Sequence, residues 1–358
     1  MKKVINIFAA ALFVAAAHLD ASACTGITLK ASDGSNITAR TIEWSGSKLT
    51  NRYVVVPRGH QYTSYTPTGQ NGITFSAKHG FVGVAIMDDN FVVEGINELG
   101  LSAGLFYFPN YGSYPPYNAE NNERTIADMQ LVSWMLSQFS TLEEVRAALP
   151  LVDLVSVAGS STVHWRVTEA SGKQIVIEYI NGECRIYDNQ VGVLTNSPAF
   201  DWQMTNLNNY VNLFAGAASP REYDNDVVLR PFGAGSGLLG LPGDMTPPSR
   251  FVRAFFLSSS APAVESGEEC VMQAFQLLNS FDIPMGLIHN GLNEAEIPSS
   301  TQWVAATDIT NCKFYYRTMY NSAIRTIDLT TIDFGSVKFF SRLLDTTEQT
   351  PIESVPVM

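Results

Sequence analysis

Cys24 has a sequence context that suits a catalytic nucleophile. Residues 1–23 resemble an export signal, and Ala21 and Ala23 form the A-x-A pattern after which a signal peptidase cuts. The cut would make Cys24 the first residue of the mature chain. Its free α-amine and its thiol both titrate slightly above neutral pH, so the amine can take the thiol proton. This pattern is typical of amidases in which one N-terminal residue supplies nucleophile and base.

Two other interpretations of Cys24 stay open at this point. Four cysteines in an exported chain allow two disulfides, and Cys24 could be half of one. Cys24 could instead anchor a lipoprotein, with lipid on both its sulfur and its amine. Anchor sites usually have Leu three residues before the cysteine, where this chain has Ala21. A lipid-anchored protein would bind apolar ligands without catalysis, because acylation removes the base.

The composition indicates a packed, acidic chain. Of 358 residues, 16% are charged and 46% hydrophobic, and the formal net charge is −12. Residues 1–23 carry a net charge of +1, so the other 335 residues carry −13. This acidity argues against nucleic acid and anionic membranes as partners. The apolar stretch 5–17 is too short to span a bilayer and no later stretch reaches about 20 residues, so we expect a periplasmic or secreted protein without a membrane span.

The remaining cysteines and the histidines do not form a metal-binding pattern. The chain has no C-x-x-C motif, and its histidines are scattered, so we expect no metal. Cys184, Cys270 and Cys312 allow at most one disulfide once Cys24 is set apart.

Two strands at the N-terminus would position Cys24. Residues 26–30 and 36–44 read as strands joined by an Asp-Gly turn, and Arg40 and Glu43 lie on the second strand. A fixed cation beside a sulfur favours its charged form, so Arg40 could activate the thiol. Glu43 could orient either that guanidinium or the α-amine. A surface ion pair between Arg40 and Glu43 is the alternative.

Asn196 is a candidate hydrogen-bond donor. It follows a strand, in a turn that ends at Pro198 and that would leave its amide exposed. Hydrolysis of an amide needs such a donor for the developing oxyanion. Asn196 could equally be a turn residue that satisfies its own backbone.

The rest of the chain predicts an α+β protein with antiparallel sheets in the middle and helices in blocks. We expect strands at 53–57, 80–87, 163–169, 174–180, 184–187, 302–308, 313–316 and 336–340, and two within 91–105. We expect helices at 125–138, 202–214, 250–257 and 268–278, and one that starts with the capping box at Thr141. We predict a single domain over residues 24–345 and a frayed tail over 346–358.

Five motifs, in order, resemble the choloylglycine hydrolase family, which contains the conjugated bile salt hydrolases and the penicillin V acylases. They span most of the mature chain at close to the family's spacing. The motifs are Cys24-Thr-Gly-Ile-Thr, Ala39-Arg-Thr-Ile-Glu-Trp44, Gly95-Ile-Asn-Glu-Leu-Gly-Leu101, Leu194-Thr-Asn-Ser-Pro-Ala-Phe-Asp-Trp-Gln203, and Gly240-Leu-Pro-Gly-Asp244 with Ser249-Arg-Phe-Val-Arg253.

The resemblance implies a role for each motif residue. Cys24 would be nucleophile and base with Arg40 against its thiol, and Asn196 would donate to the oxyanion. Arg250 would complete the polar network, and Glu43 stands where the family usually has Asp.

The resemblance also implies a substrate-binding position, a fold and an assembly. The substrate-binding position, Asn in many bile salt hydrolases and Tyr in many penicillin V acylases, falls on Tyr107, or on Phe106 if the loop slips by one. The implied fold is the four-layer αββα sandwich of N-terminal nucleophile (Ntn) hydrolases. The implied reaction needs no cofactor, and relatives are often tetramers.

Three substrate classes fit this resemblance: glycine- or taurine-conjugated bile acids, penicillin V and long-chain acyl-homoserine lactones. Each is a small-molecule amide with an apolar acyl group and a small polar amine. We place bile salts first, although Tyr107 favours penicillin V.

Overall fold

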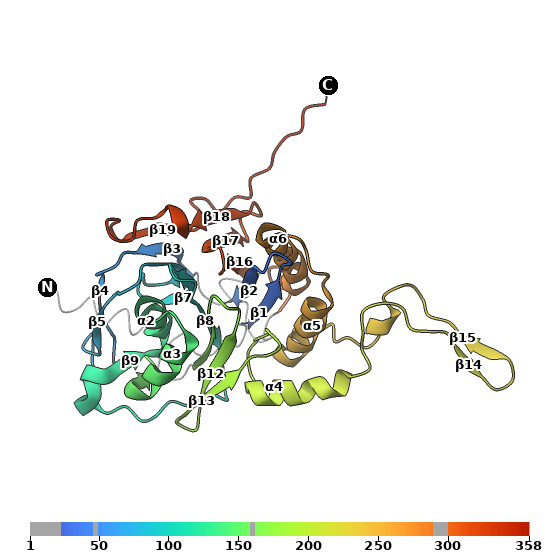
Figure 1. The fold of residues 1–358 in the computed structure, drawn as a ribbon, viewed down its shortest axis with the longest axis horizontal. Helices are drawn as coiled ribbons and strands as arrows, with labels where there is room; N and C mark the ends of the chain where they lie inside the picture. Colours follow the sequence, from blue (N-terminus) through green and yellow to red (C-terminus); the bar gives the residue numbers. More distant parts are fainter. Residues whose placement is uncertain (1–22, 46–48, 158–161, 289–299, 358) are drawn as a thin grey trace.

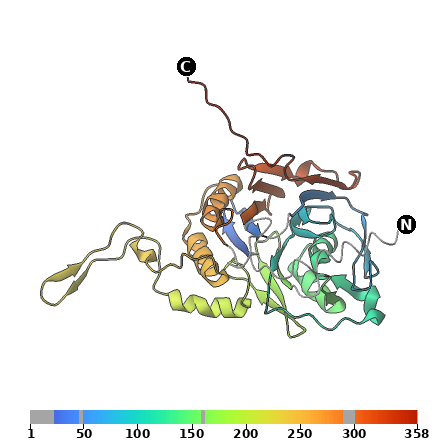
Figure 2. The ribbon, with the colours of Figure 1, turned by 180° about the vertical axis from the view of Figure 1, so that it is seen from behind.

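The computed structural model describes residues 23–45, 49–157, 162–288 and 300–357, so all of the predicted export signal except Ala23 lies outside the described residues. Two antiparallel sheets stack between layers of helices (Figures 1 and 2). One continuous hydrophobic core joins both sheets and the helices on them. The predicted four-layer αββα sandwich is confirmed.

The smaller sheet carries Cys24 on its first strand. Its strand order is β1 (Ala23–Lys30), β2 (Asn36–Trp44), β16 (Ser300–Asp308), β17 (Lys313–Thr318) and β18 (Arg325–Asp328). The predicted Asp-Gly turn joins β1 to β2, and Gly34 takes the positive φ that this turn requires. β16 is buried along its whole length because helices cover one face of this sheet and the larger sheet covers the other.

The larger sheet has eight strands. Their order is β13 (Glu183–Asp188), β12 (Gln174–Ile180), β11 (Val163–Thr168), β8 (Ser102–Tyr107), β7 (Val92–Asn97), β6 (Phe81–Ile86), β3 (Asn51–Val56) and β19 (Phe340–Leu343). The predicted meander is β11–β12–β13, and Asn181 and Gly182 adopt positive φ in its second turn. The last predicted strand, at 336–340, forms later in the chain as β19, where it pairs with β3.

Helices cover both outer faces. α5 (Pro247–Ser260) and α6 (Gly267–Leu278) pack on the smaller sheet, whereas α2 (Leu131–Gln138) packs on β7 and β8 of the larger one. α3 (Leu142–Ala148) follows α2, and α4 (Phe200–Asn206) contacts α5. No helix among the described residues is long and apolar enough to cross a membrane.

Short elements complete the structure. They are the strands β4 (Gln61–Thr63), β5 (Thr74–Ser76), β9 (Thr125–Ala127), β10 (Asp153–Val155), β14 (Arg221–Tyr223) and β15 (Val227–Leu229), and the 3₁₀ turns Ala119–Arg124, Asp128–Gln130, Leu149–Leu151, Leu207–Tyr210, Ser236–Leu238, Asn279–Phe281 and Leu329–Thr331.

Two predicted helices are shorter than expected. The helix expected over 125–138 starts only at Leu131, because residues 125–127 pair with β10 instead. The helix expected over 202–214 ends in a 3₁₀ turn at Tyr210.

The β14–β15 hairpin extends from the body as an arm, and residues 346–357 are exposed and contain no helix or strand (Figures 1 and 2).

The predicted capping box at α3 gives a first test of the fold. The Thr141 hydroxyl accepts from the backbone N–H of Glu144, and the Glu144 carboxylate accepts from the backbone N–H of Thr141. Thr141→Ala leaves a helix-end N–H without its acceptor, so we expect the free energy of unfolding to fall by about 1 kcal/mol. Urea denaturation measures this change. An unchanged midpoint would mean that water replaces the cap at no cost.

Candidate active site

Strand register brings Arg40 to the thiol of Cys24. Gly26, two residues beyond Cys24 on β1, pairs with Arg40 on β2. Side chains two residues apart share one face of a strand, so the thiol and Arg40 both point toward the larger sheet. Arg40 Nη2 lies 2.9 Å from Cys24 Sγ, and both side chains are buried. The alternative of a surface ion pair between Arg40 and Glu43 is therefore wrong.

A second backbone pairing places Asn196 at the nitrogen of Cys24. The N–H of Gly26 donates to Leu194 O at 2.7 Å, and the N–H of Leu194 donates back to Gly26 O at 3.1 Å. This antiparallel bridge sets Asn196 opposite Cys24. The Cys24 N–H donates to Asn196 Oδ1 at 2.9 Å, and Asn196 Nδ2 donates to the carbonyl of Tyr107 at 2.7 Å. Asn196 is thus held by a long-range contact rather than by its own turn.

Arg250 joins the same network from the helix side. It lies in the first turn of α5 and is buried. Its guanidinium donates to Asn196 Oδ1 at 2.7 Å, to Thr25 Oγ1 at 2.8 Å and to the carbonyl of Cys24. Arg250 therefore fixes the backbone of the candidate nucleophile and the amide beside it.

Glu43 lies on the opposite face of β2 from Arg40. It is buried, and its Oε1 accepts from Thr301 Oγ1 at 3.2 Å. Its Oε2 has no hydrogen-bond partner among the described residues. Burial raises the pKa of this carboxyl to about 7, although the nearby charge of Arg250 works against the increase. The Cys24 nitrogen, here in a peptide bond with Ala23, donates to Asn196 and not to Glu43.

Opposing charges surround the thiol of Cys24. Burial raises the pKa of this thiol above its ordinary value, and the charge of Glu43 adds to the increase. Arg40, a backbone hydrogen bond from Tyr107, and Arg250 lower it. The two arginines thus oppose the effect of burial and favour the thiolate.

The two candidates for the substrate-binding position occupy different environments. The Phe106 ring is fully buried, with the Arg40 guanidinium carbon 4.0 Å from its centroid. Tyr107, at the end of β8, is partly exposed, and its carbonyl holds Asn196. Tyr107 is therefore the one of the two that remains accessible to a ligand.

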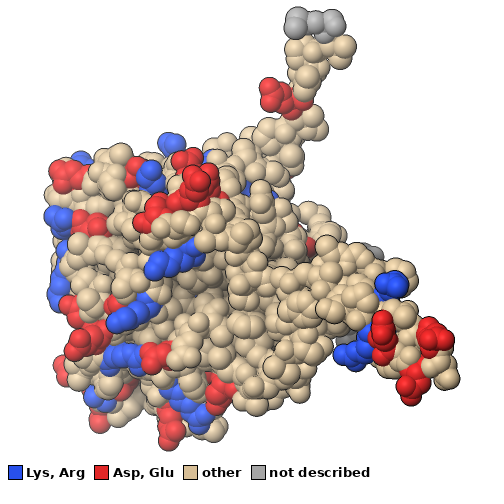
Figure 3. Space-filling model, turned by 45° about the vertical axis from the view of Figure 1, so that its right-hand side comes forward, with Lys and Arg blue, Asp and Glu red and all other residues tan. Residues whose placement is uncertain are grey.

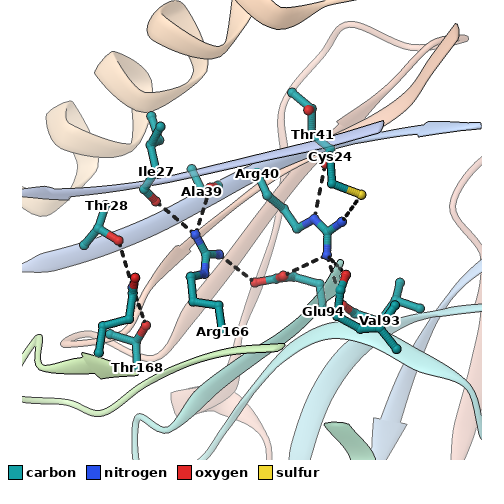
Figure 4. A network of polar contacts seen from close by, with 12 residues as sticks. Cys24, Ile27, Thr28, Ala39, Arg40, Thr41, Val93, Glu94, Arg166 and Thr168 are labelled. Atoms are coloured by element: carbon teal, nitrogen blue, oxygen red, sulfur yellow. Dashed lines mark hydrogen bonds and ion pairs between the residues drawn. The ribbon is translucent and has the colours of Figure 1, made fainter. Parts of the chain in front are cut away.

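Sequence reasoning missed the charged residues behind Arg40. Glu94 on β7 lies 3.5 Å from Arg40 and 3.3 Å from Arg166 on β11 (Figure 4). Each sits in the middle of an apolar strand, in Val92-Val93-Glu94 and in Trp165-Arg166-Val167. Charged residues are almost never fully buried without a partner, so a charge inside an apolar strand was the available signal.

His164 also supports the site. Its Nδ1 lies 3.0 Å from Glu178 Oε1, and its Nε2 lies 3.1 Å from the carbonyl of Thr195. The Phe108 ring stacks on the imidazole at 4.5 Å. A carbonyl oxygen only accepts hydrogen bonds, so Nε2 carries a proton and donates to Thr195, the residue before Asn196. This buried pair fixes the segment that presents Asn196.

The other cysteines take no part in this arrangement. Cys24, Cys184, Cys270 and Cys312 are all free thiols, so the disulfide that the sequence allowed is not formed. Among the described residues, no group of three or more His, Cys, Asp or Glu side chains could hold a metal ion.

The first strand of this αββα sandwich starts with a buried cysteine whose thiol contacts a guanidinium and whose backbone N–H donates to a side-chain amide, which is the arrangement of an Ntn hydrolase. A family model matches residues 24–349, and its description is "Linear amide C-N hydrolases, choloylglycine hydrolase family". The chain belongs to the choloylglycine hydrolase family and is a hydrolase of C–N bonds in linear amides.

Individual relatives agree with this assignment. The chain is 31% identical to a bile salt hydrolase/transferase of Clostridium perfringens, over 86% of this chain and 92% of the relative. A solved conjugated bile acid hydrolase variant from C. perfringens matches with a TM-score of 0.79 at 28% identity, over 93% of this chain and 100% of that one. Penicillin V acylase of Agrobacterium tumefaciens shares the fold, with a TM-score of 0.74 at 24% identity, over 92% and 94% of the two chains.

The buried carboxyl of Glu43 predicts a pH effect on stability. In an unfolded chain it titrates near its ordinary value of 4.5, whereas in the folded chain its pKa is about 7. The folded state then binds the proton more tightly, so stability falls as the pH rises through this window. In a chain that keeps a residue before Cys24, we expect Glu43→Gln to remove part of that fall, on the order of 2 kcal/mol between about pH 5 and pH 8.

Urea denaturation at the two pH values measures this effect. Asp128 is another buried carboxyl with a pKa of about 7. It adds the same pH dependence of stability to the wild-type protein and to Glu43→Gln, so its effect cancels in the comparison. Equal losses of stability in the two proteins would show that Glu43 titrates normally.

Proposed function

We propose that this protein hydrolyses linear amides with Cys24 as nucleophile and base, and that its substrates are glycine- or taurine-conjugated bile salts. The observation that carries the proposal is the 2.9 Å contact between Arg40 Nη2 and Cys24 Sγ, in a buried site whose amide and second arginine also converge on Cys24. A fixed cation beside a cysteine favours its thiolate, which is the form that attacks carbonyl carbons.

The reaction needs the α-amine of Cys24, and therefore the removal of residues 1–23. The thiolate attacks the amide carbonyl carbon, and the α-ammonium gives its proton to the leaving amine as the C–N bond breaks. Water then attacks the thioester carbon while the amine accepts the water's proton, and the C–S bond breaks to release the acid and restore the Cys24 sulfur. The buried Glu43 Oε2 has no hydrogen-bond partner among the described residues, so it is a suitable counter-ion for the ammonium, whose positive charge would in turn favour the ionised carboxylate.

The oxyanion would be stabilised by Asn196 and by a backbone donor. An amide nitrogen carries two N–H groups, and the carbonyl of Tyr107 takes one from Asn196 Nδ2. The second can point at the developing charge. The backbone of Tyr107, which hydrogen-bonds the sulfur, is suited to donate the other bond.

The substrate class rests on the relatives. Bile salt hydrolases of C. perfringens and Bifidobacterium longum are 31% and 30% identical to this chain, whereas a penicillin V acylase of Pectobacterium atrosepticum is 24% identical. Penicillin V is the second candidate, favoured by the partly exposed Tyr107. Acyl-homoserine lactones remain a third. The A-x-A pattern before Cys24 supports a periplasmic or secreted location.

The nucleophile is tested by Cys24→Ala and Cys24→Ser with glycocholate, taurocholate and penicillin V. We expect both variants to fold, because the thiol makes one side-chain hydrogen bond, and to lose amine release by at least about 10³-fold. Intact mass of the wild-type protein gives the control. An unmodified N-terminal Cys24 fits the proposal, whereas retained turnover in Cys24→Ala, or lipid on Cys24, would overturn it and leave a ligand-binding lipoprotein.

We also infer that the protein is a homo-oligomer, with a tetramer as the expected form, joined through the β14–β15 arm. Both strands of the arm are exposed, and the arm presents Tyr223, Val227, Leu229 and the fully exposed Phe232. Charged side chains of both signs lie beside them (Figure 3). An isolated two-stranded hairpin is marginally stable in water, so a second copy of the chain that covers it would stabilise it.

Light scattering after gel filtration tests the arm. Because the apolar contacts would supply most of the association energy, we expect a variant with Tyr223, Val227 and Leu229 all replaced by Ser to be a monomer at concentrations where the wild-type protein is an oligomer. Leu151→Ser, which changes an exposed leucine elsewhere, is the matched control. A monomeric wild-type protein would contradict the inference.

A further inference from the structure

A row of three residues crosses the larger sheet beneath the nucleophile. Glu94 on β7 pairs with Gly104 on β8, and Gly104 pairs with Arg166 on β11. Residues paired in this way lie side by side on one face of a sheet. The Glu94 carboxylate therefore reaches across the backbone of Gly104 to Arg166, with Oε1 3.3 Å from Arg166 Nη2.

Two glycines leave room for this arrangement. A Cβ at Gly104 would overlap the carboxylate of Glu94. On the facing sheet, a Cβ at Gly26 would lie 2.7 Å from Arg166 Nη1 and 2.9 Å from the Phe106 ring. Real Cβ atoms do not make such short contacts, so only glycine, which has no side chain, leaves room for the charged side chains at these two positions. The space between the sheets is built to hold these side chains.

The row also sets the charge at Arg40. The two oxygens of the Glu94 carboxylate contact different arginines: Oε2 lies 3.5 Å from Arg40 Nη1, and Oε1 is bound to Arg166 (Figure 4). All three side chains are buried. Burial raises the pKa of Glu94, and Arg166 and Arg40 oppose that increase. With Glu94 ionised, two guanidinium groups share one carboxylate and the cluster keeps one positive charge. With Arg166 absent, Glu94 would neutralise Arg40 completely.

Arg40 does not depend on Glu94 for its position. Its guanidinium donates to the carbonyls of Thr41, Val93 and Leu105, and the Phe106 ring lies over it. The carboxylate is therefore free to set the local charge while backbone carbonyls set the geometry.

We propose that Arg166, acting through Glu94, is a positioning residue that preserves a net positive charge on the Arg40 side of the Cys24 sulfur and so favours its thiolate. This inference rests on the proposed role of Cys24 as nucleophile. Among the described residues, the other charged groups that act on the Cys24 thiol are Glu43 and Arg250, which lie on the opposite face of β1, and no contact between them and this row is found there.

The competing explanation is purely structural. Arg166 Nη1 also donates to the carbonyls of Ile27 at 3.2 Å and Ala39 at 3.3 Å, and so ties the two sheets together. A residue with only that role would affect the stability of the protein and leave the titration of Cys24 unchanged.

The pH dependence of Cys24 alkylation by iodoacetamide separates the two roles without any amide substrate. Replacing Arg166 by Met removes a charge, so we expect the midpoint of thiol titration to rise by about one pH unit and alkylation below it to slow about tenfold. Replacing Glu94 by Gln removes the opposite charge, so we expect the midpoint to fall. Arg166→Lys keeps the charge and should restore the midpoint even if it unfolds at a lower temperature.

Arg325→Met is the matched control, because Arg325 also bonds a carboxylate and a backbone carbonyl, at the far edge of the smaller sheet. Midpoints that stay in place in Arg166→Met and Glu94→Gln, or that move in the same direction, would overturn the inference. If Arg166→Met does not fold, Glu94→Gln decides alone, because its Arg40 keeps three carbonyl acceptors. Midpoints that move as expected in a protein that releases no amine would instead refute the proposed function.

Discussion

The structure depends on keeping a guanidinium charged in a space that water does not enter. Burying an unpaired charge costs many kcal/mol, and a buried arginine is tolerated only when its donors are satisfied. Arg40 meets that condition with carbonyl oxygens from both sheets, Thr41 on one side and Val93 and Leu105 on the other. The two sheets must therefore stack at one spacing and one register, and that register also sets the thiol against the cation.

The first strand serves three networks at once. One face of β1 turns Cys24 toward Arg40, and the other turns Thr25 toward Arg250 on α5. Its outer edge bonds Leu194 and so brings Asn196 to the backbone of Cys24. The alternation of a β-strand thus separates the groups that act on the sulfur from those that act on the nitrogen and carbonyl, within two residues of sequence.

The sequence predicted the local parts of this arrangement better than the remote ones. The Asp-Gly turn fixes the β1–β2 register, so the proximity of Arg40 to Cys24 followed from a single hairpin. The αββα layers and the positions of Asn196 and Arg250 came from the resemblance to a family, since no local pattern reports contacts with Cys24 over more than 150 residues.

Other features depend on pairings that local patterns do not encode. The helix expected over 125–138 lost its start to a parallel pairing with β10, which is decided by tertiary contacts. Glu94 and Arg166 were overlooked because each satisfies its charge with a partner on another strand. The contacts of Glu94 and Arg166 also make four positions depend on one another, namely these two residues and the glycines Gly26 and Gly104 beside them. A side chain added at either glycine leaves a clash, and loss of either charge leaves the other unmatched, so a change at one position constrains the others and a transplanted site must carry all four.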